Sequence, residues 1–383
     1  MERILYHDII KSINIYLSEY QKLLFLSSNK YLQGIKNMVT WNTPISIHFA
    51  PIIPYSNNFS KIKITCSLIK LQKLVQHLKL KKKNIDNYFG SAKEIIIITP
   101  ITNELANFLI PSSTIHCKIK NTHIDMSSFP IHTNISHLYF EYRHHHGKNN
   151  PINLIKNLSV THLVIGDNFC FRDGLNVKIS KNITHLDVGK NNSALTLALH
   201  NSLIYLNLES YARFSCNFIP TALTHLFFDN TCLFRIDQIY PLVTHLKIGT
   251  DQANQCLVDL KYFPNVSHLT VGADNSTNYH NLRRIPTLTP TVTYLKCGTI
   301  CNPLFPIINI YRSNLVHIIF DDIFNLDINS CIPVSCRYLE FGKSFGREIS
   351  NDILKQVSQI KIYDEYPYLD LLKQEFRGNL IIF

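Results

Sequence analysis

A short phrase of alternating apolar and polar positions recurs along most of the chain. It reads apolar, Thr or Ser, His or Tyr, Leu, any residue, apolar and often Gly, as in residues 160–166, 183–189 and 243–249. Counted by its third residue, the phrase returns eleven times between His137 and Gln359, at intervals of 20 to 26 residues. Because strand side chains alternate between two faces, each phrase predicts one strand that buries its Leu and the apolar residue two positions later. The regular interval predicts a solenoid with a parallel sheet, since no single coil could bury its core alone.

The outward positions of these strands form two rows. The third residue of each phrase is nearly always a ring, and we name this set the ring row: His137, His162, His185, Tyr205, His225, His245, His268, Tyr294, His317 and Tyr338. The fifth residue differs from coil to coil, and we name this set the variable row: Tyr139, Val164, Asp187, Asn207, Phe227, Lys247, Thr270, Lys296, Ile319 and Glu340. We expect the uniform row to have a structural role, such as stacking of flat rings, and the variable row to bind a target protein.

The first 45 residues have helical periodicity instead. Asp8 precedes apolar residues with nearly helical spacing, and Ser18 begins a second apolar stretch that ends before Gly34. The pattern predicts a small helical module of about 40 residues, too small to bury a large core by itself. Such a module is usually completed by a partner or by the neighbouring domain.

Three segments between this module and the clear repeats could be degenerate early coils, namely residues 59–64, 92–97 and 114–119. Residues 67–80 carry apolar side chains at helical spacing and predict an amphipathic helix against the first coils. The expected fold is therefore an α+β repeat protein. Its parts are a helical module at 1–45, degenerate coils with a helix at 46–130, and a solenoid at 131–383.

The repeated phrase resembles the FNIP repeat, a variant of the leucine-rich repeat. The resemblance lies in residues 219–226, which read IPTALTHL, together with residues 166–169, which read GDNF. The coil length also lies in the range of leucine-rich repeats. Proline often stands just before the phrase, as Pro220 does, because it has no N–H to donate to a ladder and marks the turn into the strand. The match covers about two thirds of the chain and implies a leucine-rich-repeat-like solenoid.

The N-terminal module resembles an F-box. The matching residues are LYHDII at 5–10, Ile13, YLS at 16–18, Leu23 to Leu26, Lys30 and Trp41. Tyr6 stands where the family usually has Pro, and Asp8 stands where it usually has Glu. The resemblance implies docking on a Skp1-like protein of a cullin ubiquitin ligase. The implied docking residues are Leu5, Ile9, Ile13, Leu17, Leu24 and Leu26.

Proteins that combine an F-box with FNIP repeats occur in amoebae and large DNA viruses. The resemblance therefore implies a substrate-recruiting adaptor that holds a target protein on its solenoid and acts in the cytoplasm, or in the host cytoplasm for a viral member. We expect a monomer outside the ligase complex. The alternative is a plain protein-binding solenoid with a helical N-terminal cap and no ligase role.

Composition and charge show which class of protein this is and which partners it favours. The chain has 383 residues, of which 45% are hydrophobic and 17% charged, so it is a folded protein. Its net charge of +11 would suit a nucleic acid, but an Ile-, Asn- and Lys-rich composition is also typical of AT-rich genomes. The variable row mixes Lys247 and Lys296 with Asp187 and Glu340 and contains no Arg. We therefore do not expect nucleic acid as the partner.

No motif in the chain indicates catalysis, a cofactor or a membrane span. There is no nucleophile elbow, no HExxH and no glycine-rich phosphate loop. A straight row of parallel rings does not converge as zinc ligands must, so we expect no metal site. The ten cysteines are scattered without a CxxC pair, which fits the reducing cytosol. We therefore expect a binding protein and not an enzyme.

Overall fold

The computed structural model describes residues 45–46, 61–64, 93–98, 110, 112–120, 134–141, 159–166, 176–189, 196–208, 214–216, 218–228, 232–233, 236, 238–248, 259–272, 288–298 and 313–383. These residues belong to two compact units. Unit 1 comprises Met1–Arg172 and Lys178–Ile183, and unit 2 comprises Asp173–Val177 and Thr184–Phe383. The expected F-box helices and the helix expected at residues 67–80 lie outside the described residues.

Unit 1 is built on parallel strands that follow one another in sequence order. They are β1 (Ile45–Ser46), β2 (Lys61–Ile64), β3 (Glu94–Ile97), β4 (His116–Lys120), β5 (His137–Glu141) and β6 (His162–Ile165). Each pairs in parallel with the next, with His116 opposite His137 and His137 opposite His162. Strands β2 and β3 lie within two of the three segments that the sequence suggested as degenerate coils, and β4 overlaps the third and extends one residue beyond it. One of the three places where the chain passes between the units falls within β7 (Asn176–Lys178).

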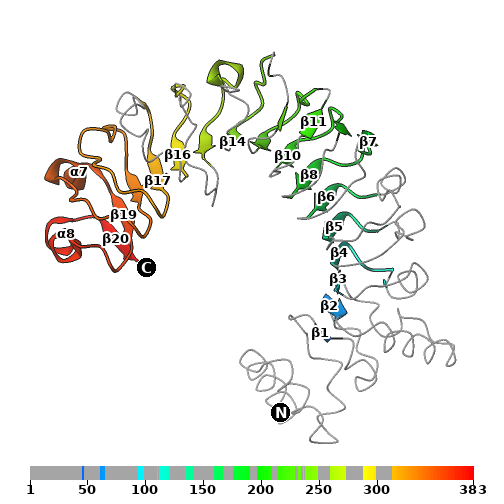
Figure 1. The fold of residues 1–383 in the computed structure, drawn as a ribbon, viewed down its shortest axis with the longest axis horizontal. Coiled ribbons are helices and arrows are strands. Elements are labelled where there is room, and N and C mark those ends of the chain that lie inside the picture. Colours follow the sequence, from blue (N-terminus) through cyan, green and yellow to red (C-terminus); the bar gives the residue numbers. More distant parts are fainter. Residues whose placement is uncertain are drawn as a thin grey trace, which may run out of the picture. The chain divides into compact units, whose positions relative to one another are not determined.

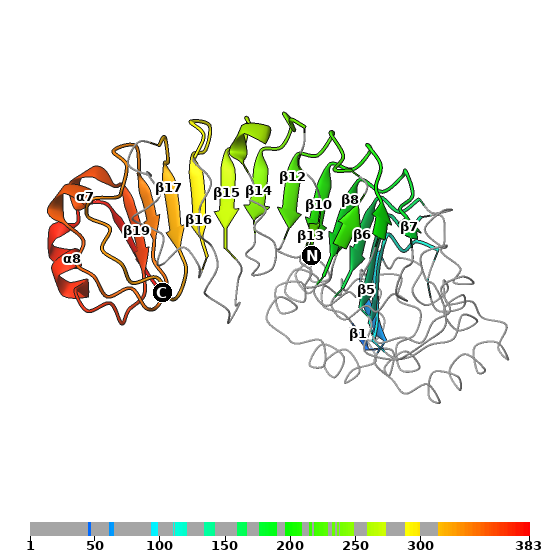
Figure 2. The ribbon, with the colours of Figure 1, turned by 45° about the horizontal axis from the view of Figure 1, so that its top comes forward.

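Unit 2 continues the same plan with ten parallel strands (Figures 1 and 2). They are β8 (His185–Val188), β10 (Tyr205–Leu208), β12 (His225–Phe228), β14 (His245–Ile248), β15 (His268–Val271), β16 (Tyr294–Cys297), β17 (His317–Phe320), β18 (Tyr338–Glu340), β19 (Gln359–Ile362) and β20 (Asn379–Ile382). Short strands on the return segments form a second sheet, which among the described residues has four strands: β7, β9 (Thr196–Ala198), β11 (Phe214–Cys216) and β13 (Cys232–Leu233). The return segments also hold the 3-10 helix η5 (Leu260–Tyr262) and the helices α7 (Asn351–Gln356) and α8 (Leu369–Glu375).

The core lies behind the sheet and is formed by alternate strand residues. In β8 the burial alternates along the strand, with Leu186 and Val188 fully buried and the ring-row and variable-row residues partly exposed. The same alternation occurs in β6, β12, β14, β15, β16, β17 and β19. The predicted parallel solenoid and its inward Leu positions are therefore confirmed. The architecture is that of a leucine-rich-repeat-like solenoid.

Hydrogen bonds from side chains join successive coils just before their strands. Asn265 Nδ2 donates to Pro241 O at 2.8 Å, and Asn314 Nδ2 donates to Pro290 O at 2.9 Å. In unit 1, Asn134 Nδ2 donates to Ser112 O at 2.8 Å in the same way. These bonds satisfy carbonyl groups in the turns that lead into the strands, and so they hold the coils in register.

A glycine often ends the phrase because neighbouring coils approach each other closely there. Gly272 follows β15 with a φ of 100°, a left-handed conformation that favours glycine. A Cβ atom added to Gly272 would lie 3.0 Å from the Cα of Gly298, which ends the next phrase. The close approach lets the Gly298 N–H donate to Val271 O at 2.7 Å.

The last coils contain a second stack of rings inside the core, which the sequence did not reveal. Phe320, Phe324, Phe341, Phe345 and Tyr366 are all buried, and neighbouring rings stack with centroid distances from 4.1 to 6.2 Å. Tyr366 also donates its hydroxyl to Arg347 O at 2.8 Å, so its polar end is satisfied. This stack fills the space between sheet and return segments where the coils are only about 20 residues long.

Candidate protein-binding face

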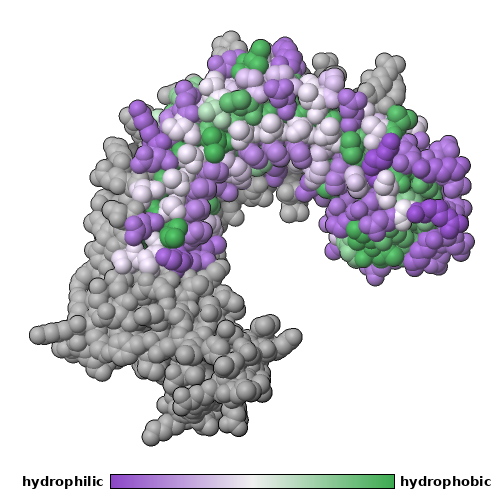
Figure 3. Space-filling view, turned by 180° about the vertical axis from the view of Figure 1, so that it is seen from behind, coloured by the Kyte–Doolittle hydropathy of each residue, from purple (hydrophilic) through white to green (hydrophobic). Residues whose placement is uncertain are grey.

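The structure places the two predicted rows on one face of the sheet in each unit. Ring-row residues occupy the first position of their strands and variable-row residues the third. The parallel register sets His225, His245, His268 and Tyr294 opposite one another along β12 to β16. In Figure 3 polar residues line the inner rim of the described coils of unit 2. The two rows thus form a partly exposed face backed by a dry core.

Most imidazoles of the ring row stack on their neighbours. In unit 1, His137 stacks on His162 with ring centroids 4.0 Å apart and planes 15° apart. In unit 2, His245 stacks on His225 at 4.2 Å and on His268 at 4.3 Å. These distances are shorter than the strand spacing of about 4.8 Å, so the rings lean together until their faces touch.

The stacking is less regular where tyrosine replaces histidine. Tyr205 lies 5.8 Å from His185 and 5.9 Å from His225, and the latter pair is tilted by 36°. Tyr294 meets His317 edge to face, with planes 73° apart. The larger phenol ring does not stack as closely on an imidazole as another imidazole does, so the regular ring stacking is interrupted at β10 and β16.

A Thr or Ser precedes each histidine of the ring row except His317, and its hydroxyl contacts Nδ1 of the ring. Thr224 Oγ1 donates to Ile204 O in the preceding coil at 3.0 Å and lies 2.9 Å from Nδ1 of His225. Ser267 repeats this arrangement, with Oγ donating to Thr244 O at 3.3 Å and lying 2.9 Å from Nδ1 of His268. A hydroxyl has a single proton, so both contacts are satisfied together only if Nδ1 carries the imidazole proton. In the neutral ring Nε2 is then a hydrogen-bond acceptor.

The environment of the ring row favours neutral imidazoles. Burial, and then the neighbouring rings His225 and His268, lower the pKa of His245 below its usual value of 6.5. Burial likewise lowers the pKa of His137 and of His317, although Glu340 opposes the shift at His317. A charged imidazole would be partly desolvated and would repel charged neighbours. At neutral pH these rings therefore contribute shape and hydrogen-bond acceptors, and not charge.

The variable row is polar and aromatic at its start in unit 2. Asn207 donates from Nδ2 to Asp187 Oδ1 at 3.2 Å and is only 8% exposed, and its Oδ1 has no hydrogen-bond partner among the described residues. Phe227 presents its ring edge-on to Tyr205 at 5.4 Å and to His225 at 6.1 Å. This part of the face is therefore held by contacts between both rows.

Toward the C-terminal end of unit 2, charged residues stand in line with the variable row, namely Glu340 of that row and Lys361 opposite it. Lys361 on β19 forms an ion pair with Glu340 on β18, with Nζ 3.0 Å from Oε1. In unit 1, the Nζ of Lys118 lies 4.0 Å from the ring centroid of Tyr139. Both contacts link neighbouring strands across the face, and they show that long side chains of this row lie along the sheet.

The face also contains residues that were not among the predicted site residues, Gln359 and Lys361 included. His116 extends the ring row of unit 1 and stacks on His137 at 4.2 Å, and Lys118 extends the variable row. In unit 2, Asn379 on β20 donates to Gln359 Oε1 at 3.3 Å. The signal for His116 was present, because residues 114–119 read TIHCKI and keep the ring, the free fifth position and the last apolar residue of the phrase, while Thr114, Ile115 and Cys117 depart from it. The signal for Asn379 was weaker: Leu380 and Ile382 keep the apolar positions of the phrase 20 residues after Gln359, but Asn379 replaces the ring.

The six residues expected to dock on a Skp1-like protein lie outside the described residues. Within the described part of the chain, no group of three or more His, Cys, Asp or Glu side chains could hold a metal ion. In that same part, no helix has both the length and the apolar character needed to cross a membrane.

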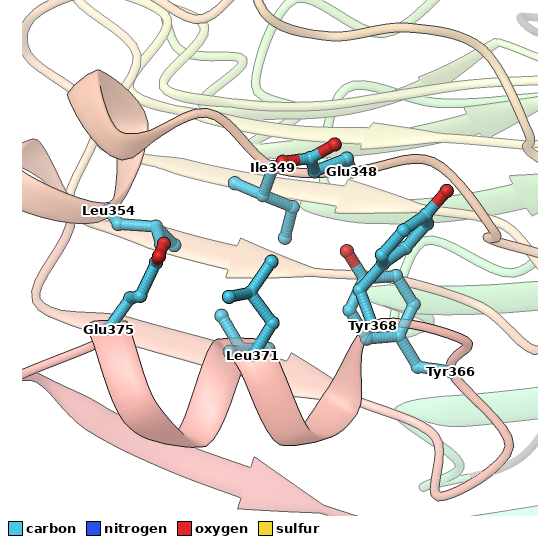
Figure 4. Close-up of a pocket in the computed structure, with 8 residues that line it drawn as sticks. Glu348, Ile349, Leu354, Tyr366, Tyr368, Leu371 and Glu375 are labelled. Carbon is cyan, nitrogen blue, oxygen red and sulfur yellow. The ribbon is translucent and has the colours of Figure 1, made fainter.

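A small hollow lies between α7 and α8 (Figure 4). Leu371 of α8 points toward Ile349, and Glu348, Glu375, Tyr366 and Tyr368 stand around the rim. Its interior volume of about 10 Å³ is far below the about 300–1,000 Å³ typical of ligand pockets. The hollow is therefore too small to rival the sheet face as a binding site.

No protein-family model matches the chain, and no curated protein matches its sequence. Among solved structures, the chain is similar to CroV588, described as a novel circular LRR protein, with 21% sequence identity and a TM-score of 0.42. The match covers 73% of this chain and 44% of CroV588, so it spans less than half of that protein. The F-box and FNIP resemblances thus rest on the residues quoted for them.

Proposed function

We propose that the chain is a protein-binding scaffold that holds its target on the sheet face of unit 2. The observation that supports this proposal is the pair of rows, in which stacked rings and cross-strand contacts fix partly exposed side chains before a partner arrives. A face ordered in advance loses little conformational entropy on binding.

The size of the face also suits a protein partner. Ten strands at a spacing of about 4.8 Å extend over about 43 Å, and a four-residue strand is about 13 Å long. The resulting area of about 560 Å² is of the same order as the about 800 Å² that each partner buries in a typical interface. A small molecule would use only a fraction of this surface.

Capture of partners from the native cell by the tagged full-length protein tests the proposal. Phe227→Asp puts a charge on β12 within the face, whereas Val334→Asp puts the same charge on a residue that is 80% exposed in the loop before β18. We expect Phe227→Asp to lose a partner that the wild type and Val334→Asp both retain. Equal capture by all three proteins would contradict the proposal.

We propose further that the scaffold is a substrate-recruiting adaptor of a Skp1-cullin ubiquitin ligase. This finer proposal is supported by the F-box resemblance of residues 1–45, and it implies action in the cytoplasm as a monomer that joins the ligase. The full-length protein should capture a Skp1-like protein and a cullin, and Leu5→Asp with Ile9→Asp should abolish that capture. Failure of well-folded wild-type protein to bind either component would refute the ligase role and leave the scaffold intact.

The alternative to the adaptor is a plain scaffold in which the N-terminal module caps the solenoid. Removal of residues 1–44 distinguishes the two roles. A cap shields the first coils, so its removal should lower the melting temperature of the remaining chain. An adaptor should keep its melting temperature and its target and lose only the ligase components.

A further inference from the structure

Two lysines of the variable row lie two strands apart in the middle of the unit 2 face. Lys247 on β14 is opposite Thr270 on β15, which is opposite Lys296 on β16. Two strand spacings put the lysine Cα atoms about 9.6 Å apart. All three side chains are partly exposed and belong to the same face of the sheet.

Among the described outward positions of this part of the face, the formally charged side chains are two lysines. The described outward positions from β12 to β17 contain no carboxylate; they are His225, Phe227, His245, Lys247, His268, Thr270, Tyr294, Lys296, His317 and Ile319. The carboxylates of the variable row in this unit lie beyond both ends of the stretch. Asp187 on β8 accepts from Asn207, and Glu340 on β18 is paired with Lys361.

The ring row beside the lysines presents a different chemistry. Thr244 and Ser267 make the same pair of contacts as Thr224, with Thr244 Oγ1 3.0 Å from Nδ1 of His245. The Nδ1-protonated tautomer that these contacts favour leaves Nε2 of His245 and His268 as acceptors. The face therefore combines a row that attracts carboxylates with a row that accepts N–H donors.

We propose that Lys247, Thr270 and Lys296, together with the rings of His245 and His268, bind an extended acidic segment of the target protein. The inference rests on the proposed function and specifies the partner. A polyproline II segment turns once every three residues with a rise of about 3.1 Å, so carboxylates at every third residue lie on one side about 9.3 Å apart. That distance matches the two lysines. The backbone N–H groups of such a segment have no internal partner and suit the Nε2 acceptors.

The same geometry disfavours nucleic acid. Proteins that bind single strands offer exposed aromatic faces on which bases stack. Here the faces of His245 are covered by His225 at 4.2 Å and His268 at 4.3 Å. A nucleic-acid backbone also has no N–H donor for Nε2, and the described outward positions of β12 to β17 include no arginine fork for its phosphates.

Fluorescence anisotropy with the full-length protein tests the inference. The probe is a labelled peptide of repeating Glu-Pro-Ala units, and its control is the matching Gln-Pro-Ala peptide. We expect the acidic peptide to bind and the neutral peptide not to bind. The double variant Lys247→Gln with Lys296→Gln should bind about fivefold more weakly, since each exposed ion pair contributes modestly. Lys261→Gln removes a lysine from η5 and should bind like wild type, and melting curves verify that every variant folds.

Each other outcome overturns the inference. The inference is wrong if the acidic peptide fails to bind, or if it binds the wild type and the double variant equally. It is also wrong if labelled single-stranded DNA binds more tightly than the peptide and is displaced by it. If the peptide fails while Phe227→Asp still abolishes target capture, only the acidic character of the partner is wrong. If target capture survives Phe227→Asp as well, the sheet face is not the binding surface and the proposed function fails too.

Discussion

Thr114 offers a sharp test of the dry core, because it places a hydroxyl where neighbouring coils have an aliphatic side chain. It lies two residues before His116, at the position that Ile135, Val160 and Ile183 occupy in following coils. Its side chain is 0% exposed, and its Oγ1 has no hydrogen-bond partner in the described structure. Thr114→Val replaces this hydroxyl with a methyl group of nearly the same shape.

The expected effect is a gain in stability. A buried hydroxyl without a partner costs about 1–3 kcal/mol, and the added methyl group gains up to about 0.8 kcal/mol through burial. Because small shifts around the new methyl group offset part of this sum, we expect Thr114→Val to raise the free energy of unfolding by about 1–2 kcal/mol.

Thr224→Val is the matched control, because the same chemical change there removes two observed contacts. Thr224 Oγ1 donates to Ile204 O at 3.0 Å and lies 2.9 Å from Nδ1 of His225. Loss of these contacts should lower the free energy of unfolding by about 1 kcal/mol. The two variants should therefore shift stability in opposite directions.

Urea unfolding gives the overall change, and native-state hydrogen exchange of the β3 to β5 amides gives the local one. The local measurement is needed because neighbouring coils of a solenoid can open separately. A loss of stability in Thr114→Val would refute the reasoning, since it would mean that the hydroxyl has a partner or that the position is not dry.

Three further predictions address other parts of the fold. Because the pKa of His245 is lowered in the folded chain, the unfolded chain binds more protons just below pH 6.5. Stability should thus be full above that pH and fall as the pH drops through the lowered value, which melting curves at stepped pH measure and His245→Gln should weaken. Gly272→Ala should cost about 1–2 kcal/mol, because a Cβ would meet Gly298 Cα at 3.0 Å in a left-handed conformation, whereas Gly346→Ala should be near neutral because its nearest neighbour is 3.7 Å away. Phe345→Ala should cost about 3–5 kcal/mol in urea unfolding of the last coils, and a change below 1 kcal/mol would show that its ring is not packed.

Much of the architecture was predictable because it depends on local pattern. The alternation in residues 160–166 predicted which side chains turn inward, since strand geometry has a period of two wherever the strand lies. The recurring interval predicted parallel stacking, because identical short strands joined by return segments can bury their Leu residues only against one another. Ring row and variable row followed from the same reasoning.

The details of the face depended on tertiary structure. Contacts between coils bring the ring centroids of His245 and His268 to 4.3 Å and partly bury His245, which lowers its pKa. Contacts between coils also bury Asn207. The inner stack around Phe345 also arises between coils, because its rings meet only when the return segments pack behind the sheet. Sequence by itself thus determined which residues face outward, through periodicity along one strand. Only the tertiary structure decided how closely they meet, because contact across strands depends on the register of coils that differ in length.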